Sequence, residues 1–166
     1  MKKILSILVV AILAASLGVA AAGPAGATAV GNTQGCTPGY WKNHPQSWLE
    51  RPTDTAPVYT PSTPLSTISN AFNSYLPGAT FGSALQGGGG TGLTGAAKIL
   101  ARAATASWLN ATVEIAFPYR RFQPGYGGVQ SINTLVTNAL LSGDRQTIID
   151  LAATLDQANN LGCPLS

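Results

Sequence analysis

Charged side chains are scarce in this sequence. Only 9% of its 166 residues are Asp, Glu, Lys or Arg. Lys2 and Lys3 stand in an expected leader, and without them seven basic side chains face six acidic ones. So neutral a chain has no basic stripe for a phosphate backbone, which excludes nucleic acid as an expected partner. With 45% hydrophobic residues the chain is too apolar to be disordered, and its length fits one domain.

Histidine and cysteine are also scarce, which limits metal and redox chemistry. One His and two Cys cannot make a closed four-ligand zinc site without carboxylates. The sequence has no C-x-x-C motif, and its Asp and Glu residues form no tight pair along the chain. The sequence therefore predicts no catalytic residue, no metal site and no cofactor.

One long apolar run is present, near the N-terminus. Residues 1–3 carry two positive charges, residues 4–22 are mainly apolar, and small residues accumulate through 23–29. This order is typical of a secretory signal peptide. An uncleaved membrane anchor is the alternative, because the run is about long enough to span a bilayer. The Ala- and Gly-rich end and the absence of a second charged flank favour cleavage.

The small-residue segment offers several peptidase sites. A-x-A motifs end at Ala22, Ala27 and Ala29. We favour cleavage after Ala27 or Ala29, because Pro24 breaks the apolar helix. The expected organisation is a signal peptide at 1–29 and a single helical domain at 30–166. The protein is expected to be secreted or held at the cell surface, with no membrane association after cleavage.

The two cysteines stand near opposite ends of the expected mature chain. Outside the cytosol such a pair most often forms a disulfide, so we predict a Cys36–Cys163 bridge. It would close nearly the whole domain into one loop, with a stabilisation of about 4–5 kcal/mol in the chain-entropy model. A reactive thiol or an intermolecular link is the alternative.

Hydrophobic periodicity and capping residues predict helices rather than strands. Thr37-Pro38 begins a short helix that runs through Asn43, and Pro45 either stops it or opens a second turn that carries Trp48. The other expected helices are a segment capped by Ser66 and ending near residue 76, an Ala-rich segment at 94–110, a segment from Ser131 to Gly143, and a segment from Asp144 to Leu161. We predict an all-α fold: a small bundle of four or five helices closed by the N-to-C-terminal disulfide, with long irregular loops.

The segments between these helices look irregular. Residues 51–64 are rich in Pro, Thr and Ser, and 86–92 are mostly Gly. The Gly-rich run resembles a phosphate loop, with Lys98 as its cation, but no Gly-Lys-Ser/Thr and no preceding strand pattern support that interpretation. Residues 112–117 alternate as a short strand would, although a helix tail leading into the aromatic loop at 117–128 is the better interpretation.

The densest group of recognition side chains lies just after Cys36. Tyr40, Trp41, His44 and Trp48 could form a ligand platform, because exposed aromatic rings cover the apolar faces of sugars. The alternative is that both indoles are core residues, and this is the favoured interpretation because aromatic side chains dominate small cores.

The same stretch carries a resemblance to a known group of proteins. Residues 35–48 resemble the C-T-x-G-Y-W-K-x-H-P-x-x-W signature of uncharacterised bacterial secreted and surface proteins. The similarity extends to 79–85, the Gly-rich run, 109–111, 142–145 and 155–164. That family has no established activity, so the resemblance implies export and the extent of the domain rather than a reaction.

Three function classes follow from these observations. The first is an exported, non-enzymatic protein with a structural or binding role. The second is binding of a carbohydrate, cell-wall polymer or surface protein through the aromatic cluster, helped by Arg120 and Arg121, although a solvated loop pair is the simpler role for these cations. The third is a hydrolase or metal-dependent enzyme centred on His44. The simpler role for the His44 side chain is a hydrogen bond within its own turn.

Overall fold

A computed structural model describes residues 33–51, 53–122 and 130–165. The expected signal peptide and its cleavage sites lie outside the described residues, as do residues 123–129 of the aromatic loop. The helices are α1 (Pro38–Asn43), α2 (Phe81–Leu85), α3 (Gly92–Thr112), α4 (Ile132–Leu141) and α5 (Arg145–Asn159). Short 3-10 segments are η1 (Pro45–Ser47), η2 (Leu65–Thr67) and η3 (Asn70–Ser74). Apart from isolated β-bridges, the described ranges contain no β-structure, so the prediction of an all-α fold is confirmed.

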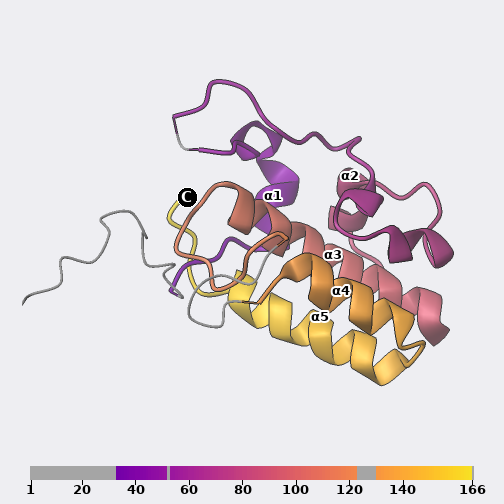
Figure 1. Cartoon of the computed structure of the whole chain (residues 1–166). Coiled ribbons are helices and arrows are strands. Elements are labelled where there is room, and N and C mark those ends of the chain that lie inside the picture. The colour runs from indigo at the N-terminus through magenta and orange to yellow at the C-terminus, as the bar shows by residue number, and fades with distance from the viewer. Residues whose placement is uncertain (1–32, 52, 123–129, 166) are drawn as a thin grey trace, which may run out of the picture.

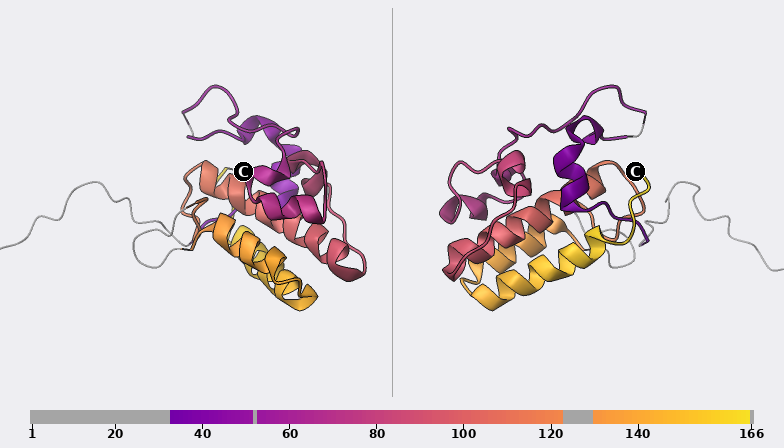
Figure 2. Two further views of the ribbon diagram at one scale, coloured as in Figure 1. Left: turned by 45° about the vertical axis from the view of Figure 1, so that its right-hand side comes forward. Right: turned by 180° about the vertical axis from the view of Figure 1, so that it is seen from behind.

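Helix α3 is the axis of the domain. It lies between the α4–α5 pair on one side and α1 with α2 on the other (Figures 1 and 2). All residues from Ala103 to Val113 are buried, so its C-terminal half is enclosed on every face. Two buried hydroxyls are satisfied within the helix, because Thr105 donates to the Ala101 carbonyl and Thr112 to the Trp108 carbonyl.

The α4–α5 pair forms as the sequence predicts. Ser131 caps α4 by accepting from the backbone N–H of Thr134, and Asp144 caps α5 by accepting from that of Thr147. Between the two helices Gly143 has a φ of 62°, a left-handed conformation that favours glycine. The short turn makes the two helices antiparallel neighbours (Figure 1).

The predicted helix after Ser66 is wrong. The chain forms η2 and η3 instead, separated by Ser69, whose backbone is extended (φ −159°, ψ 131°). Ser69 is buried, and its hydroxyl lies 2.7 Å from that of Thr137 on α4 while it caps η3. In this extended conformation the Ser69 hydroxyl meets both the Thr137 hydroxyl and the backbone N–H of Ala71. The apolar positions Ile68 and Phe72 still reach the core, as the periodicity indicated.

Helix α2 was not predicted from the sequence. Thr80 and Ser83 form a reciprocal capping box, in which the Thr80 hydroxyl accepts from the Ser83 N–H and the Ser83 hydroxyl from the Thr80 N–H. Phe81 and Leu85 anchor the helix in the core. A helix this short depends on its cap and its buried side chains rather than on propensity.

The Gly-rich run is a loop, as expected, and it lies close against the start of α3. The carbonyl of Gly90 sits where a Cβ on Gly95 would be, so Gly95 must lack a side chain. The loop backbone therefore packs directly against the first turn of α3.

Glu114 supplies a stability prediction. It follows the C-cap of α3 with a φ of 56°, the left-handed position that glycine normally fills. We expect Glu114→Gly to raise the unfolding free energy by about 1 kcal/mol, measured by urea denaturation. Glu114→Ala is the control, because it removes the charge but keeps the Cβ. A Gly variant no more stable than the Ala variant would contradict the assignment of strain.

Asp144 supplies a pH prediction. Hydrogen bonds from the Thr147 hydroxyl and backbone N–H lower the pKa of the Asp144 carboxyl below its ordinary value. A lowered folded-state pKa stabilises the protein above the unfolded pKa, and this stabilisation is lost as the pH falls through the folded value. We expect wild type to be more stable than Asp144→Asn at neutral pH and the difference to shrink in acid. Urea unfolding at several pH values measures it, and a pH-independent difference would contradict it.

Candidate functional site

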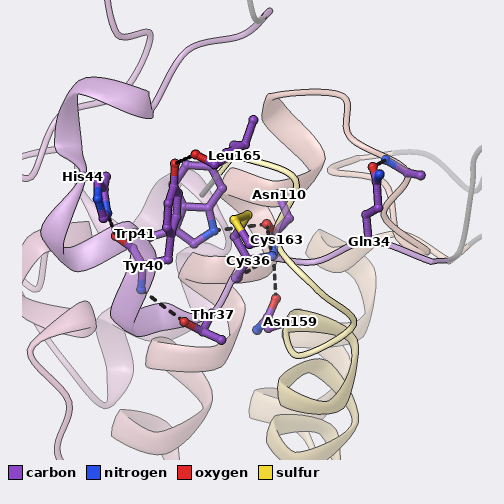
Figure 3. Close-up of a disulfide and its surroundings, with 11 residues drawn as sticks. Gln34, Cys36, Thr37, Tyr40, Trp41, His44, Asn110, Asn159, Cys163 and Leu165 are labelled. Atoms are coloured by element: carbon purple, nitrogen blue, oxygen red, sulfur yellow. Dashed lines mark hydrogen bonds between the residues drawn. A yellow bond between two sulfur atoms is a disulfide. The ribbon is translucent and has the colours of Figure 1, made fainter.

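The two ends of the described chain are joined by a disulfide. Cys36 and Cys163 are bonded across 127 positions of sequence, which confirms the predicted bridge (Figure 3). Cys36 is fully buried. Beside the bridge the backbone N–H of Gly35 donates to the carbonyl of Gly162 over 2.9 Å. A Cβ on Gly35 would collide with the Ala158 carbonyl at the end of α5, so only glycine allows the approach.

Asn110 of α3 binds the N-terminal segment at Cys36 from the interior of the domain. Its Oδ1 accepts from the backbone N–H of Cys36 (2.8 Å) and from Nε1 of Trp41 (3.1 Å). Its Nδ2 donates to the Cys36 carbonyl (2.9 Å) and to Oδ1 of Asn159 (2.9 Å). All four hydrogen-bonding positions of this fully buried amide are therefore occupied by protein groups (Figure 3).

Asn159 extends this hydrogen-bond network to the end of α5, which leads into the C-terminal segment with Cys163. Its Oδ1 also accepts from the Ser107 hydroxyl over 3.0 Å, and its Nδ2 donates to the Ala103 carbonyl over 3.0 Å. Asn159 thus ties the end of α5 to α3 one turn before Cys163. We call the disulfide, the Gly35–Gly162 bond and the two asparagines the clasp. None of its polar side chains carries a charge.

The aromatic cluster after Cys36 is mostly internal. Trp41 and Trp48 expose 0% and 1% of their surface, so neither offers a ring face to a ligand. Nε1 of Trp48 donates to the Trp41 carbonyl over 3.0 Å. This corrects the idea of an exposed platform that includes both indoles and agrees with the core interpretation. The pattern pointed to aromatic residues, but only the packing decides which way they face.

Tyr40 and His44 lie half-buried at the edge of the clasp. Their rings stack with centroids 4.3 Å apart, and Nδ1 of His44 donates to the Tyr40 carbonyl over 2.8 Å. The Tyr40 hydroxyl donates to the Leu165 carbonyl over 3.0 Å, which holds the C-terminal segment (Figure 3). His44 thus makes the hydrogen bond within its own turn that the sequence suggested as its simpler role.

The two candidate arginines have different surroundings. Nη2 of Arg121 donates to Glu50 over 2.9 Å, and Nη1 donates to the Tyr59 hydroxyl over 3.3 Å. Burial lowers the pKa of Arg121, but these hydrogen bonds outweigh it and raise the pKa overall. Arg120 is half-buried, and its backbone pairs with Gln130 and Ile132. The hydrogen bonds of the Arg121 side chain thus go to Glu50 and Tyr59 rather than to the aromatic cluster.

Sequence reasoning missed the two asparagines that organise the site. Asn110 opens an Asn-Ala-Thr triplet of the kind that is glycosylated in some secreted proteins, but its full burial excludes that modification in the folded protein. For Asn110 the available signal was an amide in the Ala-rich second half of α3, because a buried amide needs internal partners. Asn159 lies in a helix rich in polar residues and carries no such signal.

Within 33–51, 53–122 and 130–165, no three His, Cys, Asp or Glu residues are grouped to hold a metal ion. Across the same described ranges, no helix combines the length and the hydropathy needed to span a membrane. No family model, curated protein or solved structure matches the chain.

Asn110→Ala tests the clasp. It leaves the N–H and carbonyl of Cys36 and Nε1 of Trp41 buried without this partner, so we expect a loss of about 3 kcal/mol or more of unfolding free energy in urea. Asn138→Ala is the matched control, because Asn138 is exposed on α4 and should change stability little. Equal effects of the two substitutions would contradict the role given to Asn110.

Proposed function

We propose that this protein is an exported, non-enzymatic module with a structural or binding role at the cell surface or in the extracellular space. The observation that carries the proposal is the clasp. The buried polar side chains of the clasp bond to other groups of the protein and hold the domain closed. All four hydrogen-bonding positions of the Asn110 amide are taken in this way. Such an arrangement favours durability over turnover.

The environment required by the clasp supports the exported location. Disulfides form and persist outside the cytosol, where thiols are not kept reduced. The expected signal peptide at 1–29 leads to the same compartment by an independent argument. The resemblance of 35–48 to secreted and surface proteins fits the same proposal.

The signature residues support a structural role for that motif. Several are engaged in holding the fold: Cys36 in the disulfide, Thr37 and Pro38 in starting α1, Tyr40 with Leu165, Trp41 with Asn110, and Trp48 with Trp41. A cell-wall polymer or surface protein would therefore contact other surfaces, or only the outer edges of Tyr40 and His44. Within the described ranges the His44 ring stacks on Tyr40 and bonds to its carbonyl, so these contacts support a structural role for His44 and leave the His44-centred enzyme as the alternative.

Export of the full chain from a bacterial host tests the proposal. We expect the product in the medium or the wall fraction, with an N-terminus at Thr28 or Val30 by mass spectrometry and no titratable thiol. The control is a chain that begins at Val30, which should stay in the cytosol with reduced cysteines. A full-length product that remains inside the cell with both thiols free would contradict the proposal.

The same preparation measures what the bridge contributes. Replacing both cysteines by serine should lower the unfolding free energy by about 4–5 kcal/mol if the chain-entropy account holds. The distribution of the exported protein between medium and wall separates a free module from one that binds the cell surface.

A further inference from the structure

A half-open cavity lies between α2 and α3, away from the clasp. Its volume is about 200 Å³. Its lining includes buried Leu65, Ala84 and Ala101 and half-buried Leu76 and Ala79. A cavity of about 150 Å³ with such walls holds a molecule like benzene, so this one fits a slightly larger apolar group.

The rim of this cavity is positively charged. Lys98 contributes to the lining, and no Asp or Glu does. Arg102 lies one helical turn further along α3, on the same side. The ion pair found among the described residues joins Arg121 to Glu50, so neither Lys98 nor Arg102 has an acidic partner within that part of the chain.

The Gly-rich loop packs against the aliphatic stems of Lys98, which lines the cavity, and of Arg102, which lines the groove between α3 and α5. A Cβ on Gly88 would lie 3.5 Å from Cδ of Lys98, and one on Gly87 would lie 3.7 Å from Cδ of Arg102. The loop backbone therefore approaches both aliphatic stems. Ser83 also borders the cavity, but its hydroxyl is committed to the cap of α2. Lys98 is thus the charged side chain in the lining, and it is exposed and forms no ion pair with a described residue.

Two other hollows lack this combination. The groove between α3 and α5 is lined by both Arg102 and Asp156, so its charges are mixed. The hollow beside Tyr40 and Leu165 is lined by no charged side chain. Of these three, the α2–α3 cavity combines an apolar lining with a cation and no acidic side chain.

We propose that this cavity binds a small amphipathic monocarboxylate, with its apolar tail on Leu65 and Ala101 and its carboxylate at the Lys98 ammonium. The tail gains from leaving water, and the carboxylate pairs with a cation that has no acidic partner. Because the mouth is open to solvent, the ion pair is screened, and the dissociation constant should be on the order of 1 mM. This inference does not depend on export.

Titration of the purified domain with hexanoate, followed by amide chemical shifts in NMR spectra, tests the proposal. Saturable shifts are expected at Gly87, Gly88 and Ala101. Lys98→Gln should weaken hexanoate binding about fivefold and leave the binding of neutral hexanol unchanged, because only the charge contact is lost. Lys42→Gln, an exposed lysine on α1, is the matched control and should change neither.

A second variant tests the apolar part of the cavity. Ala79→Leu adds bulk to the half-buried lining and should weaken hexanoate and hexanol alike. Shifts that do not saturate, or an equal effect of Lys98→Gln and Lys42→Gln on hexanoate, would overturn the proposal. Hexanol binding as tightly as hexanoate would overturn the assignment of a carboxylate ligand.

Discussion

The amide of Asn110 decides how this domain can close. Both the N–H and the carbonyl of Cys36 bond to it, as they would to a neighbouring strand, so the N-terminal segment gains a ladder-like partner inside an all-helical protein. Without that partner the segment would enter the core with unpaired backbone groups, which is costly. With it, Cys36 reaches the end of α5, where Asn159 has fixed the approach to Cys163.

The burial of α3 follows from the same requirement. A helix enclosed on all sides loses stability for each polar side chain in it that finds no partner. Among the described residues, the indole N–H of Trp108 is the buried side-chain group that has none. Thr105 and Thr112 bond to carbonyls of their own helix, while Ser107 and Asn110 bond to Asn159. Because these groups are neutral, closure should depend little on pH.

The aromatic residues near Cys36 serve this closure more than they serve recognition. The indole N–H groups of Trp41 and Trp48 both end on internal acceptors, so the rings combine apolar burial with a fixed orientation. The α2–α3 cavity is separated from the clasp, so binding there can vary without disturbing the disulfide.

Local sequence determined the elements whose signals are local. Contacts between neighbours in sequence form the helix caps at Thr37, Ser131 and Asp144 and the left-handed turn at Gly143. The disulfide follows from the chemistry of the two cysteines, and the structure has all of these features as expected. Tertiary contacts decided the rest. Ser69 leaves the helical region to reach Thr137, and Asn110 finds Asn159 across 49 positions. Hydrophobic periodicity reports which face is buried, but a buried hydroxyl or amide has to find its partner in space, and that partner is not encoded nearby.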